Sequence, residues 1–267
     1  MQKTFNYNGI PIVYTVTGNG QPVVLLHGFA EESSIWKEQV HFLKDTCQLI
    51  VPDLPGSGKS AMLQIENASM EDYASCIKAL LDHENIGTCI MLGHSMGGYI
   101  TLAFAERFPG KLKGFGFVHS TAFADNEEKK ATRKKGIKFI EEHGAYAFIK
   151  NTTPNLFSAS TKKQHPEKVE DLIEQGKSFS EEALVQYYTS MMNRPDRTAV
   201  LAEAVVPVLF IIGTEDTAAP LDDLLKQVHL PKMADINIIE DAGHMSMLEK
   251  PDILNKHLLD YITDVTS

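Results

Sequence analysis

The sequence is poor in cysteine and contains no pattern for a disulfide framework or a metal site. Its three cysteines, Cys47, Cys76 and Cys89, are odd in number, widely spaced and embedded in apolar patterns, so we expect small buried core residues. Ten histidines are present, but none forms a pair at metal-ligand spacing with a third ligand nearby. We therefore expect no bound metal.

The chain also lacks an excess of positive charge and any long hydrophobic run. Its formal net charge is -10 and its pI is near 5.5, which argues against nucleic acid or an anionic membrane as a partner. No apolar stretch reaches membrane-spanning length, and no charged and then apolar leader precedes the first strand pattern. We expect a cytoplasmic protein that acts on a small molecule. A homodimer would be compatible with the sequence, but no self-complementary stripe predicts one.

What the sequence does contain is a regular alternation of strand and helix patterns. Its 267 residues, 43% of them hydrophobic, are enough for one α/β domain with an insertion. Asn8-Gly9 predicts a hairpin between the first two strands. Strands are expected over residues 4–7, 10–17, 23–26, 47–51, 88–92, 113–118, 208–213 and 236–239, and helices over 34–45, 69–83, 96–108, from 220 and over 247–262. This order predicts an α/β fold with a mostly parallel eight-stranded sheet and helices on both faces.

Residues 120–196 interrupt the alternation. Strand patterns vanish there, and charged helical patterns rich in aromatic residues take over. We expect a helical cap inserted into a core made of residues 1–119 and 197–267. The basic run over residues 129–135 is flanked by glutamates and should form the solvated face of a helix. The cap aromatics and the Met191-Met192 pair could roof an apolar pocket, although their helical spacing also fits simple packing.

The most informative motif, Gly93-His94-Ser95-Met96-Gly97, lies between a buried strand pattern and an apolar helix pattern. Gly-x-Ser-x-Gly in this position is typical of a nucleophile elbow, a sharp turn that presents one hydroxyl above the sheet. Small residues on both sides let the backbone turn without clashes. Ser95 is therefore the candidate nucleophile, and a tight turn with an idle serine is the alternative.

A serine hydroxyl needs a general base within hydrogen-bond reach and a third group that orients the base. Asp216 follows one buried strand and His244 follows the last strand, so both are expected at the carboxyl edge of the sheet, where ligands bind. Asp125 is the rival for the acid. Glu215 should point the other way, and Asp241 is expected to cap or brace the histidine loop.

With these motifs the chain resembles the α/β-hydrolase superfamily over nearly its whole length outside the cap. The triad candidates follow the order Ser, Asp, His of that family. The other matches are His27-Gly28-Phe29, similar to the oxyanion loop, Asp53–Ser60, similar to the Asp-x-x-Gly-x-Gly-x-Ser loop, Trp36, Gly213-x-x-Asp216 and Gly243-His244.

The resemblance implies the α/β-hydrolase fold and a catalytic role for each of these positions. Ser95 would attack a carbonyl, His244 would take the serine proton and deliver it to the leaving group, and Asp216 would hold the imidazole tautomer. The backbone N–H groups of Phe29 and Met96 would form the oxyanion hole. No cofactor is implied.

Two charged segments near these motifs indicate which ligands the protein is expected to exclude. Gly58-Lys59-Ser60 looks like the end of a P-loop, but Asp53 stands where that motif needs glycine, so nucleotide binding is not expected. Asp53 should instead hydrogen-bond within its own loop. Glu31 and Glu32 follow the oxyanion loop, where many relatives carry glycine or small polar residues. If they face the cleft, they would disfavour an anionic acyl group.

The sequence thus predicts a cofactor-free serine hydrolase that cleaves a small or medium carboxylic ester through an acyl-enzyme. The same triad could hydrolyse a thioester, a lactone, an amide or a carbon–carbon bond, and the sequence does not separate these. A serine nucleophile argues against dehalogenase and epoxide hydrolase chemistry, which forms an ester on a carboxylate. A ligand-binding module with little turnover is the alternative from another class, but three filled triad positions favour an enzyme.

Overall fold

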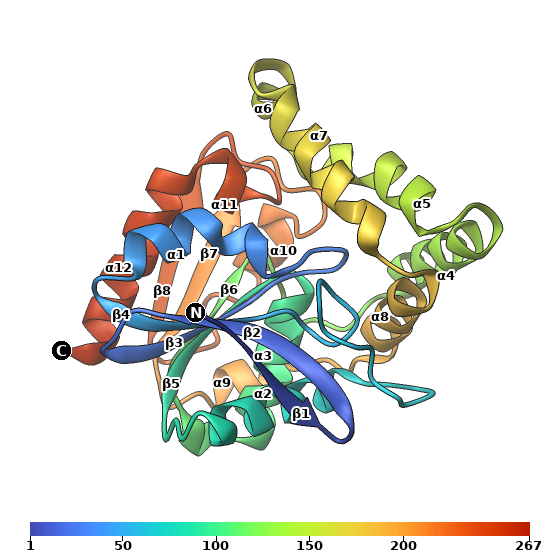
Figure 1. The fold of residues 1–267 in the computed structure, drawn as a ribbon. Coiled ribbons are helices and arrows are strands. Elements are labelled where there is room, and N and C mark those ends of the chain that lie inside the picture. Colours follow the sequence, from blue (N-terminus) through green and yellow to red (C-terminus); the bar gives the residue numbers. More distant parts are fainter.

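A single eight-stranded sheet forms the centre of the computed structural model, which describes residues 1–267 (Figure 1). The strands lie in the order β1-β2-β4-β3-β5-β6-β7-β8. The first two form an antiparallel hairpin, β2 is antiparallel to β4, and the remaining pairs are parallel. This confirms the predicted mostly parallel sheet. Its strands are β1 (Gln2–Tyr7), β2 (Ile10–Thr17), β3 (Gln21–Leu26), β4 (Cys47–Pro52), β5 (Cys89–His94), β6 (Leu112–Val118), β7 (Val208–Gly213) and β8 (Ala234–Ile239).

Helices cover both faces of this sheet, because the central strands are apolar on both sides. In β3, Val23 and Leu25 belong to one hydrophobic core and Val24 and Leu26 to the other, as the alternation of side chains along a strand requires. One core packs under α2 and α3, and the other under α1 and α12. The helices of the sheet domain are α1 (Lys37–Leu43), α2 (Met70–His83), α3 (Met96–Arg107), α9 (Thr198–Ala202), α10 (Leu221–Leu225), α11 (Ser246–Glu249) and α12 (Pro251–Thr266).

Residues 120–196, between β6 and β7, contain helices joined by loops and no strand, which confirms the inserted helical region. In Figure 1 its helices stand to one side of the sheet, beyond the ends of β6 and β7. Most of the basic run over residues 129–135 is exposed as predicted, but Arg133 is only 18% exposed and pairs with a buried carboxylate. The helices are α4 (Glu127–His143), α5 (Ala145–Thr152), α6 (Ala159–Gln164), α7 (Pro166–Gln175) and α8 (Glu181–Asn193).

Local details differ from the sequence prediction at two helices. The helix expected over residues 34–45 starts as a 3₁₀ turn, Ser33–Trp36, and continues as the short α1. The helix expected over residues 247–262 is divided into α11 and α12, because Pro251 occupies the first turn of α12 and cannot donate the hydrogen bond that would continue α11. All three cysteines are unpaired and buried, as expected. No helix is both long and apolar enough to cross a membrane.

Candidate active site

Ser95 lies at a sharp turn between β5 and α3. Its backbone angles, φ 50° and ψ -115°, lie outside the regions that most residues adopt. A Cβ atom on Gly93 would lie 2.2 Å from the carbonyl group of Gly97, and one on Gly97 would lie 2.5 Å from the carbonyl oxygen of Leu26. The two glycines of the motif are therefore required by close backbone packing, and Ser95 is held half-buried at the carboxyl edge of the sheet.

Asp216 and His244 are in direct contact. Nδ1 of His244 lies 2.8 Å from Oδ2 of Asp216. The other carboxylate oxygen accepts hydrogen bonds from the N–H groups of Ala218 and Ala219, at 2.8 and 2.9 Å. Because an ionised carboxylate can only accept, Nδ1 of His244 carries the proton. Nε2 then presents its lone pair, as a general base requires.

The surroundings shift the pKa values of Asp216 and His244 in opposite directions, and each shift favours the charged form of its group. Burial alone would raise the pKa of Asp216, but His244 and His119 outweigh it and lower this pKa, so the carboxyl group is ionised. Burial alone would lower the pKa of His244, but the charge and hydrogen bond of Asp216 outweigh it and raise this pKa above the ordinary 6.5. Glu31 and Glu249 act in the same direction.

The elbow and the histidine loop touch each other. Nε2 of His94 donates a hydrogen bond to the carbonyl oxygen of His244 at 2.9 Å, and the centroids of the two rings are 4.8 Å apart. No hydrogen bond joins the hydroxyl of Ser95 to His244 in this structure. Such bonds are commonly long in enzymes without substrate and shorten only when the reacting complex forms.

Phe29 and Met96 lie where the oxyanion hole was expected. Phe29 follows the end of β3, and its N–H donates no hydrogen bond within the protein. Met96 is the first residue of α3, so its N–H has no acceptor within the helix. A Cβ atom on Gly28 would lie 2.9 Å from Nδ1 of His94, which shows how closely the loop packs against the elbow.

Glu31 does not face a cleft. The hypothesis that this glutamate repels an anionic acyl group was therefore wrong. Its side chain is 3% exposed, and Oε2 accepts the N–H of Gly28 at 2.7 Å and lies 3.0 Å from Nδ1 of His94. Burial alone would raise the pKa of Glu31, but His94 and the Gly28 N–H lower it. Glu31 therefore holds the oxyanion loop against the elbow.

The histidine loop is braced by Glu249, which the sequence analysis placed only within the helix expected over residues 247–262. Its Oε1 accepts the N–H groups of Gly243 and Met245, at 2.9 and 3.2 Å, and its Oε2 accepts the N–H of Ser158 at 2.8 Å. Asp241, the expected brace, is exposed. The available signal was a glutamate five residues after His244, directly after the apolar pair Met247-Leu248.

His119 is a further residue that the sequence interpretation missed. Its Nδ1 lies 3.0 Å from the same Asp216 oxygen that His244 contacts. The donor atoms of these three residues lie within 4.8 Å of one another, close enough for a metal site. Nδ1 of each histidine already contacts the Asp216 carboxylate, however, so an ion is not needed to hold the three side chains together.

The rival acid, Asp125, is engaged elsewhere. Its carboxylate is fully buried, pairs with Arg194 at 2.8 Å and accepts a hydrogen bond from Nε of Arg133 at 2.5 Å. Burial alone would raise the pKa of Asp125, but the two arginines lower it. Asp125 therefore joins the start of the helical region to its end and does not orient His244.

Two other acidic side chains lie as predicted. Glu215 points away from His244, and its Oε2 accepts the N–H of Ala159 at 2.7 Å. Asp53 hydrogen-bonds within its own loop through the N–H of Lys59, and it also accepts the N–H of Ser33, both at 3.0 Å.

Aromatic rings from the helical region cover the oxyanion loop. The ring of Phe29 stacks on that of Tyr188 with centroids 4.3 Å apart and an interplanar angle of 10°. Phe148 packs edge-on against both rings, at 6.2 and 5.6 Å. The region next to the expected oxyanion hole is therefore apolar and closely packed.

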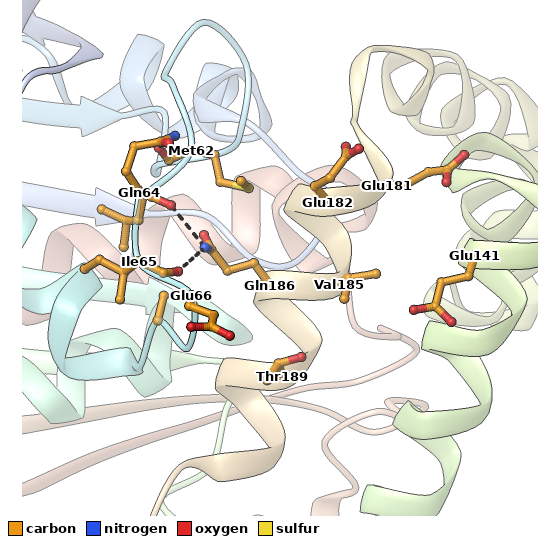
Figure 2. Close-up of a pocket in the computed structure, with 12 residues that line it drawn as sticks. Met62, Gln64, Ile65, Glu66, Glu141, Glu181, Glu182, Val185, Gln186 and Thr189 are labelled. Atoms are coloured by element: carbon orange, nitrogen blue, oxygen red, sulfur yellow. Dashed lines mark hydrogen bonds between the residues drawn. The ribbon is translucent and has the colours of Figure 1, made fainter.

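A groove of about 570 Å³ lies apart from these groups, between the segment before α2 and helix α8 (Figure 2). The side chain of Gln186 spans one side of it and donates to the carbonyl oxygens of Leu63 and Ile65, at 3.1 and 3.0 Å. The lining contains four glutamates but none of the triad candidates. The groove is therefore separate from the candidate active site.

Comparison with known proteins agrees with this fold. A model of the alpha/beta hydrolase family matches residues 23–257. A thermophilic esterase from Thermogutta terrifontis (malate bound) has a TM-score of 0.93 and 28% identity, with both chains fully (100%) covered. Lipase 1 of Psychrobacter immobilis is 28% identical, over 92% of this chain and 78% of its own. The 2-hydroxy-6-oxononadienedioate/2-hydroxy-6-oxononatrienedioate hydrolase of Burkholderia vietnamiensis is 27% identical, over 93% of this chain and 90% of its own.

The role of Asp125 can be tested by Asp125→Asn. The substitution leaves the buried Arg194 without its counter-charge, so the free energy of unfolding should fall by about 3 kcal/mol. Urea denaturation measures this change. Asp223→Asn, at an exposed pair with Lys226, is the control and should change stability by less than about 1 kcal/mol. Equal stability of the Asp125 variant and the wild type would contradict the structural role.

Proposed function

Because the chain belongs to the alpha/beta hydrolase family, we propose that it is a cofactor-free serine hydrolase of small or medium carboxylic esters. The observation that carries the proposal is the 2.8 Å contact between Asp216 and Nδ1 of His244. This contact fixes the tautomer in which Nε2 of the same ring can take a proton from Ser95.

In the proposed reaction, the hydroxyl oxygen of Ser95 attacks the ester carbonyl carbon while its proton moves to Nε2 of His244. The N–H groups of Phe29 and Met96 stabilise the oxyanion that forms. The tetrahedral intermediate collapses, the proton passes from His244 to the leaving alkoxide, and an acyl group remains on Ser95. Water then attacks the acyl-enzyme with His244 as base, which releases the acid and restores the serine.

The preference for esters of limited size is supported by the packing of the helical region. We propose that residues 120–196 act as a cap whose rings Phe148 and Tyr188 limit the acyl pocket beside Phe29. Two of the relatives are named an esterase and a lipase. A relative of similar identity is named a hydrolase of a 2-hydroxy-6-oxo dienedioate, so cleavage of a carbon–carbon bond by the same triad is the second candidate.

Hydrolysis of p-nitrophenyl esters from acetyl to octanoyl tests the proposal. The wild type should turn over the short and medium esters, and Ser95→Ala should lower kcat by at least about a thousandfold, because the nucleophile is lost. Thr101→Ser, a buried site on the same helix, serves as the matched control and should retain activity. Absent turnover, or turnover that survives Ser95→Ala, would contradict the ester proposal; hydrolysis of a 2-hydroxy-6-oxo dienoate would then support the second candidate.

The proposed size limit predicts the effect of Tyr188→Ala. Removing the ring that stacks on Phe29 should admit longer acyl chains and raise the ratio of octanoyl to acetyl kcat/KM by about tenfold. Tyr146→Ala is the control, because Tyr146 is not in this stack and bonds Glu174 at the surface. An unchanged ratio in the Tyr188 variant would rule out this ring as a limit on the acyl chain.

The raised pKa of His244 predicts the pH dependence of kcat/KM. Only the unprotonated ring can act as base, so activity should fall as pH decreases, with a midpoint above the ordinary 6.5. Asp216→Asn removes the charge that raises this pKa and should move the midpoint downward. A profile measured between about pH 5 and pH 9 that is flat, or has its midpoint below the ordinary histidine value, would contradict His244 as the base.

A further inference from the structure

His119 directly follows β6 and has a positive φ angle, which is uncommon for residues other than glycine. Its φ is 55°, in the left-handed region. The ring is fully buried, and the backbone N–H donates to the carbonyl oxygen of Ile211 at 3.0 Å. Residues persist in such conformations where the surrounding structure requires them, often at functional sites.

Both nitrogens of the His119 ring have partners in the triad region. Nδ1 lies 3.0 Å from Oδ2 of Asp216, and Nε2 lies 2.7 Å from the hydroxyl oxygen of Ser246. Ser246 is fully buried and comes two residues after His244 in the chain. The loop that carries His244 therefore also supplies a partner for His119.

The direction of these hydrogen bonds follows from the protonation states of His119 and Asp216. Burial lowers the pKa of His119, so the ring is neutral and has one N–H. The ionised Asp216 can only accept, which places that N–H on Nδ1. Nε2 must then accept from the hydroxyl of Ser246. The result is a directed chain from Ser246 to His119 to Asp216.

This series of hydrogen bonds completes the set of donors around Asp216. One carboxylate oxygen accepts two backbone N–H groups, from Ala218 and Ala219. The other accepts from both His119 and His244. A carboxylate held by the backbone on one oxygen and by His119 on the other cannot rotate away from His244, and the donation from His119 withdraws part of the negative charge that His244 would otherwise experience.

We propose that His119 is a positioning residue that fixes the carboxylate of Asp216 and limits the basicity it confers on His244. This inference rests on the proposed hydrolase function. Without the His119 donor, Asp216 should hold the protonated form of His244 more strongly, so the acid limb of activity should move to higher pH. The titratable and charged groups that surround His244 are Asp216, His119, His94, Glu31 and Glu249.

The test compares two substitutions of His119. His119→Phe keeps a planar ring but removes the donor, whereas His119→Asn offers an amide N–H near the position of Nδ1 and tolerates the left-handed backbone. We expect the phenylalanine variant to move the acid limb of kcat/KM upward by about one pH unit. Its kcat should fall by about tenfold, the equivalent of one charge-assisted hydrogen bond, with little change in KM. The asparagine variant should remain close to the wild type.

Ser246→Ala provides a second variant in case His119→Phe does not fold, as judged by circular dichroism. Without the hydroxyl, Nε2 loses the donor that fixes the tautomer of His119, so the acid limb should move in the same direction by a smaller amount. Folded variants of His119 and Ser246 with the wild-type acid limb would overturn the proposal. The proposal would also be overturned if His119→Phe and His119→Asn lost kcat equally and neither moved the acid limb of kcat/KM. Such a result would indicate that His119 contributes only by packing.

The downfield proton resonance of His244 Nδ1–H, followed by NMR as a function of pH, separates this inference from the proposed function. It reports the protonation of His244 without turnover. If the wild type hydrolyses esters but His119→Phe leaves the titration of His244 unchanged, only the positioning role fails. If the wild type hydrolyses no ester but the midpoint of the His244 titration still moves to higher pH in His119→Phe, the proposed function fails and the positioning role stands.

Discussion

The buried carboxylate of Asp216 is the group on which the rest of the site depends. A negative charge in a dry environment is tolerated only when donors surround it, and here the donors are two backbone N–H groups and two imidazoles. The loops after β6, β7 and β8 each supply part of this set. The loops that follow three neighbouring strands thus meet at one carboxylate. The contact with this carboxylate gives His244 a defined tautomer and orientation.

Two other buried carboxylates hold the loops of the site in the same way. Glu31 joins the oxyanion loop to the elbow, and Glu249 joins the histidine loop to Ser158 in the inserted region. Each accepts backbone N–H groups that would otherwise be left without partners in a region closed to water. The negative charges also raise the pKa of His244, so the bonds that fix the geometry also favour a protonated, positively charged imidazole during the proposed reaction.

The sequence predicted the strands of the sheet, the inserted helical region, the sharp turn at Ser95, and the placement of Asp216 and His244 at the carboxyl edge of the sheet, because these depend on local patterns. Apolar runs identify buried strands, and the elbow needs glycines at fixed spacing. The sequence did not predict the roles of Glu31, Glu249 and His119, each of which has one partner far away in the chain, at a separation of 63, 91 and 97 residues respectively. Arg133 was misjudged for a different reason: a basic run suggests a solvated helix face, but Arg133 turns back to Asp125, which lies eight residues earlier, just before α4.

The central claim is that Ser95 is a nucleophile activated by His244. Treatment with a fluorophosphonate followed by intact-mass measurement and peptide mapping tests it most directly, because an unactivated serine does not react. The account predicts one adduct per chain in the wild type, located on Ser95, with no adduct in Ser95→Ala and a greatly slowed reaction in His244→Ala. A wild-type protein that stays unlabelled, or labelling of Ser95 that is equally fast in His244→Ala, would contradict it.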